Sequence, residues 1–237
     1  MKEPLLKWHV FADARKMAEA VAGNTLELAE HAISERGRFT IVLAGGSTPA
    51  AIYSLLSRAD CEWKKWHVYF GDERCVPRGA EDRNDSMAHG LWLDHVDIPA
   101  EQIHPIPAEL GARAGAESYA KTLNSVGDFD LTLLGMGEDG HTASLFPGHP
   151  AGADPHSPDV LAVENAPKPP PDRISLSANR LSRSKAVKVL VTGAGKREAV
   201  AGLRRGDDIP IRAIAPAAGL DVLLDEAAAV PDPGESN

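Results

Sequence analysis

The side chains best suited to chemistry lie in one glycine-rich segment, GMGEDGHTASLFPG, at residues 135–148. Three glycines within six residues favour an irregular backbone, which presents Asp139 and His141. A neutral imidazole can take a proton from water at physiological pH, and a nearby carboxylate can fix its tautomer. A lone histidine is more often a structural residue. In this setting, however, the pattern predicts that His141 is a general base for hydrolysis and that Asp139 supports it.

A second charged motif, GDER at residues 71–74, comes directly after the apolar run 67–70. Burying any of its charges without a partner would be costly. Asp72 and Arg74 are therefore candidates for orienting and polarising the oxygen atoms of a substrate. The alternative, a local ion-pair network that closes the edge of a sheet, is equally compatible with the residues.

The motif LAGGSTP at residues 43–49 is a candidate anion site. Gly45 and Gly46 allow a ligand to approach the backbone closely, and Ser47 and Thr48 offer hydroxyl and N–H groups where a helix is predicted to begin. The alternative is a tight strand-to-helix turn in which Ser47 or Thr48 is the N-cap.

Two further cations, Arg173 and Lys196, lie at the edges of the last two predicted strands. Both could be ordinary surface charges. Together with the glycine turn they could instead bind a phosphate group, with Arg173 as a planar fork and Lys196 as a point charge.

These motifs need a framework, and apolar runs alternating with helical patterns supply it. Strands are predicted at residues 39–44, 67–70, 129–134, 173–177 and 186–192, and helices at 13–36, 48–58, 84–93 and 112–124. This alternation predicts an α/β fold with a mostly parallel twisted sheet and helices on both faces. Ligands in such sheets bind beyond the carboxyl ends of the strands, where every motif above falls, so we expect one shared site.

The 237-residue chain is expected to form a single domain over residues 1–230, followed by a flexible tail at 231–237. Residues 146–172 contain eight prolines and little periodicity, which predicts a long loop over the sheet.

The formal charge of −9 argues against a nucleic-acid partner, and no segment has the pattern of a signal peptide or a membrane span. We therefore expect a cytoplasmic protein. The spacing of the histidines matches no zinc site, so neither a metal nor a cofactor is expected.

Taken in order, LAGGSTP, GDER, GMGEDGHTASLFPG, PDRISLS and VTGAGK resemble the 6-phosphogluconolactonase family. The resemblance implies a fold shared with glucosamine-6-phosphate deaminases and related to ribose-5-phosphate isomerase. It also implies hydrolysis of a small molecule, 6-phospho-D-glucono-1,5-lactone. We expect the protein to be a monomer or weak homodimer. It assigns water activation to His141, the shape of the pocket to Asp72 and Arg74, and phosphate binding to a set that comprises Gly46, Ser47, Arg173 and Lys196.

Two rival functions remain. The related deaminases look like GxDGHIAFNEP at the histidine loop, and Phe146 stands here at the place of their glutamate. Because an apolar ring cannot transfer a proton, this difference favours the lactonase. A non-catalytic sugar-phosphate sensor should carry a helix-turn-helix segment and a basic face, which the acidic chain does not suggest.

Overall fold

A parallel sheet runs through the molecule and ends at the site described below. The computed structural model describes residues 4–230, and the predicted tail at 231–237 lies outside them. Within the described residues, seven strands form this main sheet in the order β1-β10-β9-β6-β2-β3-β5, and every neighbouring pair is parallel. The strands are β1 (Leu6–Phe11), β2 (Phe39–Leu43), β3 (Trp66–Phe70), β5 (Ile103–His104), β6 (Phe129–Gly135), β9 (Ser184–Val191) and β10 (Leu220–Asp225).

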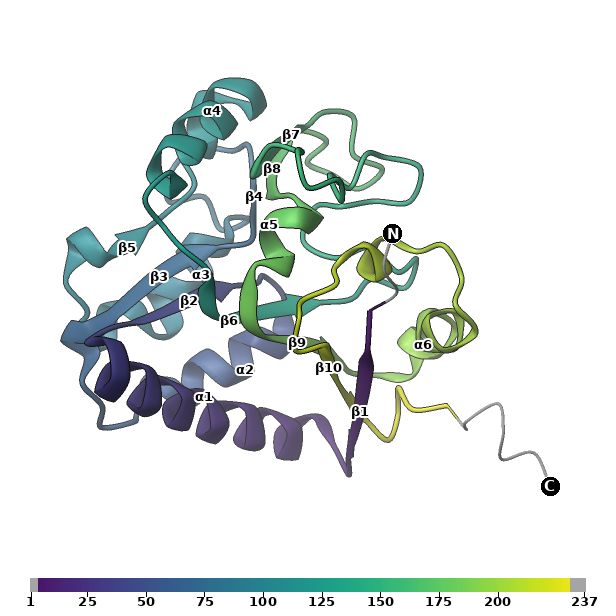
Figure 1. The fold of residues 1–237 in the computed structure, drawn as a ribbon, viewed down its shortest axis with the longest axis horizontal. Helices are drawn as coiled ribbons and strands as arrows, with labels where there is room; N and C mark the ends of the chain where they lie inside the picture. The colour runs from purple at the N-terminus through teal and green to yellow at the C-terminus, as the bar shows by residue number, and fades with distance from the viewer. Residues whose placement is uncertain (1–3, 231–237) are drawn as a thin grey trace.

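Helices cover both faces of this sheet, as predicted (Figure 1). The α-helices are α1 (Ala14–Arg36), α2 (Ser47–Leu56), α3 (Asn84–Leu91), α4 (Ala112–Leu123), α5 (Ala178–Ser182) and α6 (Arg197–Arg205). Helices α1 and α2 lie below the sheet in Figure 1, whereas α4 and α5 lie above it. Short 3₁₀ turns occur at Trp63–Lys65, Leu93–His95, Ala100–Gln102, Ala108–Leu110, Ala194–Lys196 and Pro210–Ala213.

The first helix shows how local sequence sets an element. The carboxyl group of Asp13 accepts the backbone N–H of Lys16 at 2.7 Å and caps the start of α1. Gly37 ends the helix in the left-handed conformation, with φ of 73°, and its N–H donates to the carbonyl of Ile33 at 2.8 Å. Between these caps, one apolar stripe that includes Met17 packs against the sheet.

A second, antiparallel sheet corrects one prediction. In the described part of the chain it consists of β4 (Asp72–Arg74), β8 (Arg173–Leu176) and β7 (Val160–Val163). The predicted strand 173–177 was assigned to the parallel sheet, and this assignment was wrong. A fully buried four-residue strand has the same apolar pattern in either sheet, so its sequence does not reveal its partners.

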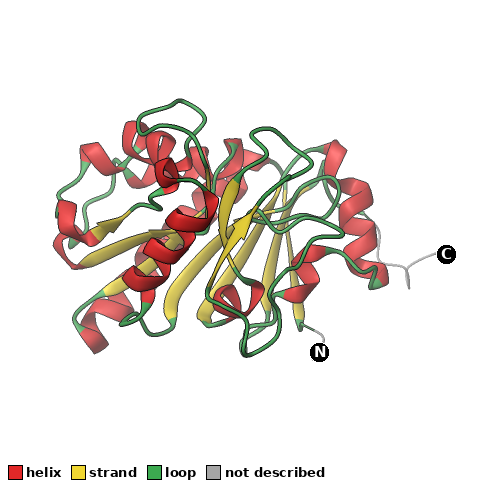
Figure 2. Ribbon diagram, turned by 90° about the horizontal axis from the view of Figure 1, so that it is seen from above, coloured by secondary structure: helices red, strands yellow, loops and turns green. Residues whose placement is uncertain are grey.

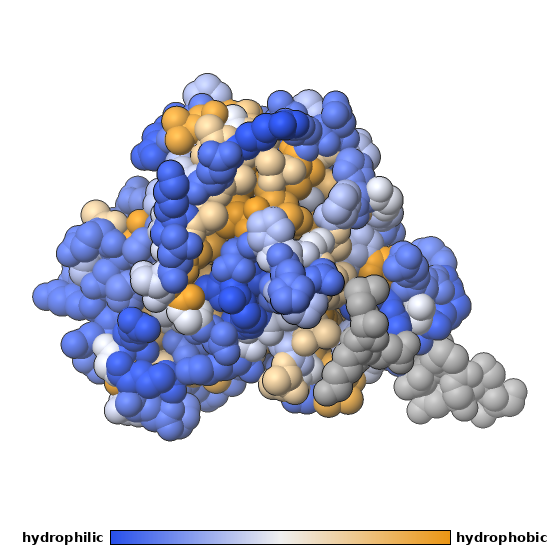
Figure 3. All heavy atoms as spheres, turned by 45° about the horizontal axis from the view of Figure 1, so that its top comes forward, coloured by the Kyte–Doolittle hydropathy of each residue, from blue (hydrophilic) through white to orange (hydrophobic). Residues whose placement is uncertain are grey.

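The proline-rich segment 146–172 also contains more structure than the predicted loop, because β7 lies within it. Seen from above, the strands of the main sheet lie side by side beneath α4 and the second sheet (Figure 2). The surface on the second-sheet side is mostly hydrophilic, with hydrophobic residues gathered in a hollow (Figure 3). No helix of residues 4–230 has the length and apolar content needed to cross a membrane.

Candidate active site

A cleft of about 280 Å³ opens beyond the carboxyl ends of β2, β6 and β9. Its walls include every predicted site residue except Asp139, which lies behind His141. The segments that were predicted to meet at one edge of the sheet therefore do so. The predicted residues that line the cleft are Gly45, Gly46, Ser47, Thr48, Asp72, Arg74, His141, Arg173 and Lys196.

His141 is held by a carboxylate two residues earlier. Its Nδ1 lies 2.5 Å from Oδ1 of Asp139, and its backbone N–H donates to the same oxygen at 3.3 Å. The turn that carries both residues requires glycine at position 137, because a β-carbon there would lie 1.9 Å from His141 Nδ1. A proton on Nδ1 would be shared with Asp139, which leaves Nε2 as the basic nitrogen of a neutral ring.

The environment keeps this imidazole neutral. Burial lowers the pKa of His141 and outweighs the opposing effect of Asp139, and the side chain is 20% exposed. Burial alone would raise the pKa of Asp139, but the hydrogen bond and charge of His141 outweigh it, so the pKa of this carboxyl is lowered. The pair is suited to accept a proton at neutral pH.

Lys168 completes this cluster and was not predicted from the sequence. Its Nζ lies 3.4 Å from His141 Nδ1 and 3.7 Å from Asp139 Oδ1. The like charge of Lys168 also lowers the pKa of His141. Lys168 belongs to the proline-rich segment, 27 residues from His141, and no local pattern marks it.

Phe146 closes one side of the histidine. Its ring centroid lies 4.9 Å from that of His141, and the residue is 1% exposed. The guanidinium carbon of Arg173 lies 5.5 Å from the same ring. One side of the His141 ring is therefore packed against a buried apolar ring.

Asp72 is buried, with 6% of its surface exposed, and two side chains hold its carboxyl group. The hydroxyl of Ser144 donates to Oδ2 at 2.6 Å, and the amide of Asn84 donates to Oδ1 at 3.1 Å. The same amide donates to the carbonyl of Asp72 at 2.9 Å. Sequence reasoning missed both supporting residues, since each comes from a different segment of the chain.

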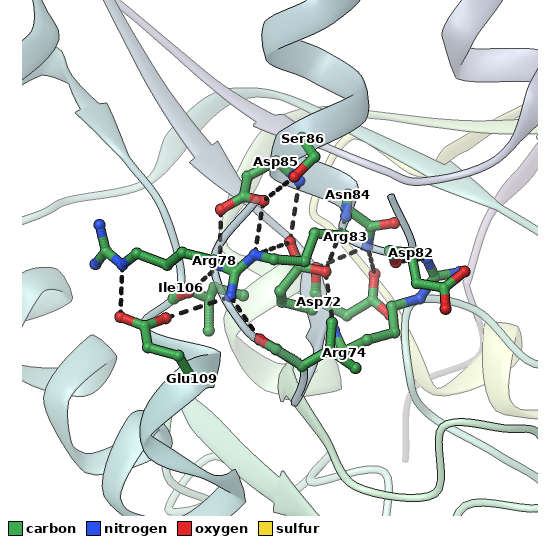
Figure 4. A network of polar contacts seen from close by, with 12 residues as sticks. Asp72, Arg74, Arg78, Asp82, Arg83, Asn84, Asp85, Ser86, Ile106 and Glu109 are labelled. Atoms are coloured by element: carbon green, nitrogen blue, oxygen red, sulfur yellow. Dashed lines mark hydrogen bonds and ion pairs between the residues drawn. The ribbon is translucent and has the colours of Figure 1, made fainter. Parts of the chain in front are cut away.

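Asn84 is itself held by a buried polar network at the start of α3 (Figure 4). Glu73 accepts the backbone N–H groups of Asn84 at 2.8 Å and Asp85 at 3.0 Å. Arg83 donates two hydrogen bonds of 2.7 Å to Asp85 and also reaches Glu109. Burial raises the pKa of Glu73 to about 7 despite these donors. The ion-pair network considered for the GDER motif is thus present, and it supports the cleft from behind.

Both predicted arginines donate side-chain hydrogen bonds to backbone carbonyls. Arg74 Nη1 donates to the carbonyl of Asp82 at 2.5 Å, and its buried Nε has no hydrogen-bond partner among the described residues. Arg173 donates to the carbonyls of Lys168, Pro169 and Pro170 at 3.3, 3.0 and 3.0 Å. Arg173 therefore attaches the proline-rich segment to the rim of the cleft.

The glycine turn ends in a helix without a side-chain cap. Gly46 is the N-cap of α2, with φ of 104°, so neither Ser47 nor Thr48 has the N-cap role considered above. Thr48 instead shares a hydrogen bond of 2.7 Å with the hydroxyl of Thr192. Because the first N–H groups of a helix lack intrahelical partners, this turn is suited to an anion.

Lys196 faces the same cleft from the turn after β9. Its backbone N–H donates to the carbonyl of Gly193 at 3.0 Å, but its side chain has no hydrogen bond or ion pair with any other described residue. The carboxyl of Asp225, at the end of β10, accepts the N–H of Gly193 at 3.0 and 3.1 Å and fixes the turn. Within residues 4–230, no group of three His, Cys, Asp or Glu side chains is arranged to hold a metal ion.

The fold and this cleft define a class of protein. Residues 12–223 match the family described as glucosamine-6-phosphate isomerases/6-phosphogluconolactonase. The chain belongs to this family, which confirms the resemblance seen in its motifs.

Particular relatives narrow the comparison. A 6-phosphogluconolactonase of Mycobacterium leprae is 37% identical over 242 residues, which cover 95% of this chain and 98% of that protein. The solved structure of the 6-phosphogluconolactonase of Trypanosoma brucei has a TM-score of 0.81 and 29% identity, and the match covers 95% of this chain and 97% of that one. A monomeric glucosamine-6-phosphate deaminase, 20% identical, matches with a TM-score of 0.79 over 94% and 98% of the two chains and shares the fold alone.

Proposed function

We propose that this chain hydrolyses 6-phospho-D-glucono-1,5-lactone to 6-phospho-D-gluconate, the second step of the oxidative pentose phosphate pathway. The observation that carries the proposal is that His141, on the wall of a cleft also lined by Arg74, Arg173 and Lys196, is held by Asp139 behind it. Relatives that share most of the chain's length and carry the name 6-phosphogluconolactonase support the same substrate.

The chemistry begins with water. The lactone carbonyl is already electrophilic, so the site needs a positioned water, a base and stabilisation of charge. His141 Nε2 takes a proton from water while its oxygen attacks C1, and Asp139 stabilises the imidazolium that forms. This step converts the carbonyl oxygen into an oxyanion on a tetrahedral carbon. General-base assistance of this kind contributes ~10²–10⁴-fold to the rate.

Ring opening returns the proton. The oxyanion reforms the carbonyl, the bond between C1 and the ring oxygen breaks, and the ring oxygen receives the proton from His141. One water is consumed, and the base is regenerated without a covalent intermediate, metal or cofactor. Arg74 lines the cleft, and its guanidinium supplies positive charge that can stabilise the oxyanion. Asp72 shapes the wall beside it.

Phosphate binding holds the lactone in register. The glycine turn and first turn of α2, with Gly45, Gly46, Ser47 and Thr48, face the same cleft as Lys196. The ammonium group of Lys196 forms no ion pair with another described residue. Arg173 adds positive charge from β8 of the small antiparallel sheet. Binding energy at a phosphate remote from C1 orients the reacting carbonyl.

The deaminase alternative is disfavoured by Phe146. Its buried ring lies against His141, at the place where those deaminases carry a glutamate that assists ring opening. An apolar ring can shield the imidazole from water but cannot transfer a proton.

We infer that the chain acts on the lactone in the cytoplasm, as a monomer or weak homodimer with neither nucleic acid nor membrane as a partner.

The experiment is a coupled assay with freshly generated 6-phosphogluconolactone, in which 6-phosphogluconate dehydrogenase converts the product and NADPH is recorded. Hydrolysis above the spontaneous rate is expected, unchanged by EDTA and lost in His141→Ala. The exposed His31 of α1 gives the matched control, and His31→Ala should keep full activity. A rate equal to spontaneous hydrolysis would overturn the proposal, and glucosamine 6-phosphate would then be tested.

A further inference from the structure

A second cavity, of about 450 Å³, lies at the opposite edge of the main sheet. The cleft described above is at the carboxyl ends of the strands, whereas this cavity is at the amino ends of β2, β3, β6 and β9. The residues after α4, at positions 125–128, form part of its wall. None of its lining residues belongs to the proposed catalytic cleft.

Polar side chains line this cavity at a place where the face of the sheet would normally be apolar. Thr40 and His67 are register partners on β2 and β3, and Tyr69 and His104 are partners on β3 and β5. Because side chains two residues apart share a face, His67, Tyr69 and His104 stand on one side of the sheet. Parallel strands covered on both faces are normally near-continuous apolar runs, so this polar stripe is unusual.

Three of these side chains form a stack of parallel rings. The ring centroids of Tyr69 and His104 are 4.4 Å apart with an interplanar angle of 15°, and those of His67 and His104 are 5.9 Å apart at 5°. Nε2 of His104 is buried and has no hydrogen-bond partner among the described residues. Two imidazoles held side by side in a cavity are groups that an anion could recruit.

The fixed charges of the cavity are unevenly paired. Asp130 receives Arg36 Nη2 and Lys185 Nζ, each at 2.8 Å, and two further hydrogen bonds from Thr40. Its carboxylate is therefore fully used. The side chain of Arg38 has no hydrogen bond or ion pair with any other described residue, although it lies in the same lining.

The sign of the site follows from this pairing. Arg36 and Lys185 are paired with Asp130, and Arg36 also with Glu35 just outside the lining, so Arg38 is the lining cation whose side chain is left for a ligand within the described residues. Hydroxyl groups of Thr122 and Ser125 lie in the same wall. Guanidinium, imidazole and hydroxyl donors converging on one cavity are the chemistry that recognises an oxyanion.

We propose that this cavity is a second ligand site, separate from the catalytic cleft, which binds a small phosphate-type oxyanion through Arg38 with His67 and His104. The shared chemistry is the tetrahedral oxyanion, whether free phosphate or the phosphate group of a small metabolite.

Binding of the anion should be coupled to proton uptake by the two histidines. Burial, together with the charge of Arg38, lowers the pKa of His67, and burial, together with His67, lowers the pKa of His104. Both rings are neutral at pH 7, so each can gain a positive charge when a negative ligand arrives. The anion raises both pKa values, and its affinity therefore increases as the pH falls. Arg36, Lys185, Tyr69, Asp128 and Asp130 also face the cavity and set the background charge.

The test is a titration of the full-length protein with inorganic phosphate at constant ionic strength, followed by NMR of the histidine Cε1–H signals. His67 and His104 report on the second cavity and His141 on the catalytic cleft, so the two sites are read separately. We expect the His67 and His104 signals to shift saturably, with more protons taken up and tighter binding at pH 6 than at pH 8.

Matched charge variants identify the donor. Arg38→Ala should raise the Kd read at His67 and His104 about tenfold while the response of His141 is unchanged. The exposed Arg58, outside both sites, gives the control variant Arg58→Ala, which should match the wild type. A glucono-lactone phosphate analogue or sugar phosphate that shifts the same signals would identify a metabolite as the source. Signals of His67 and His104 that respond to phosphate no more than to chloride would overturn the proposal, as would equal effects of Arg38→Ala and Arg58→Ala.

Discussion

The side-chain oxygen of Asn84 occupies the space in which a β-carbon of residue 45 would stand. A β-carbon built on Gly45 lies 1.9 Å from Asn84 Oδ1, while the nitrogen of the same amide donates to Asp72. The turn after β2, the start of α3 and the carboxylate of β4 are therefore packed around one amide group. The shape of the cleft depends on that contact.

Gly45→Ala tests this contact. The added methyl group forces Asn84 away from Asp72, so we expect a loss of roughly 1–3 kcal/mol in the free energy of unfolding and a lower kcat/KM. Asn84→Ala removes the obstructing oxygen. The double variant should therefore lose less free energy of unfolding than the sum of the losses in the two single variants, as measured by urea unfolding. Strict additivity would contradict the proposed packing.

Gly23→Ala is the control for this substitution. Gly23 lies within α1, and a β-carbon there meets no atom within 4 Å. Because alanine favours the helix over glycine, this variant should gain roughly 0.5–1 kcal/mol and keep its activity.

The pH dependence of kcat/KM should report on His141. The proposed base works only when neutral, so activity falls as the pH drops through its pKa, which burial sets below the ordinary value. In Asp139→Asn a charge that raises this pKa is lost, and the acid limb should move to lower pH. In Lys168→Gln a charge that lowers it is lost, and the limb should move to higher pH.

Rates corrected for spontaneous lactone hydrolysis at each pH would provide the check. Asp139→Asn should also lower the plateau rate by about tenfold or more, because the ring loses its charged partner. Limbs that move in the same direction in the two variants would show that these charges do not act on the catalytic base.

Lys196→Ala should separate phosphate binding from chemistry. Loss of a charge-assisted contact of roughly 1.5–3 kcal/mol would raise KM for the phosphorylated lactone by about ten- to a hundredfold. The kcat/KM for unphosphorylated glucono-1,5-lactone should not change. Lys64, exposed and outside the cleft, supplies the control Lys64→Ala. Equal losses on both substrates would place Lys196 in the chemical step instead.

Stability should depend on pH through Glu73. Burial raises its pKa from an ordinary 4.5 to about 7, so the folded protein holds a proton that the unfolded chain has released. Protonation of Glu73 therefore contributes to the free energy of unfolding, by about 3 kcal/mol for a shift of this size. This contribution is fully present below pH 4.5 and is lost as the pH rises to about 7. The free energy of unfolding should be measured for the wild type and for Glu73→Gln between pH 4.5 and about 7. The value for the wild type minus the value for the variant should fall as the pH rises, and a constant difference would contradict the raised pKa of Glu73.

Local patterns were sufficient to predict that Asp139 and His141 lie together. Asp139 and His141 are two residues apart on a glycine-rich turn, so their contact is encoded in one short segment. The remaining predicted residues follow strands of one parallel sheet or of the small sheet beside it, and strand ends bring them to one edge. Parallel topology thus converts several short motifs into one cleft.

Contacts between distant segments were not predictable in the same way. Lys168, Ser144 and Asn84 reach the site from loops and a helix start whose positions depend on the whole fold. Strand 173–176 was placed in the wrong sheet, since its apolar pattern is the same with either set of partners. Nor did the prolines around β7 disclose a strand in the segment predicted to be a loop.

The arrangement of β1 and β10 bears on how the chain is made. Within the described residues β1 pairs only with β10, so β1 has no strand neighbour until β10, which lies far later in the chain, has been synthesised. The same late segment carries Asp225, which fixes the turn that presents Lys196. A nascent chain can form the central strands early, but ligand binding should appear only once β10 has been synthesised and has inserted between β9 and β1.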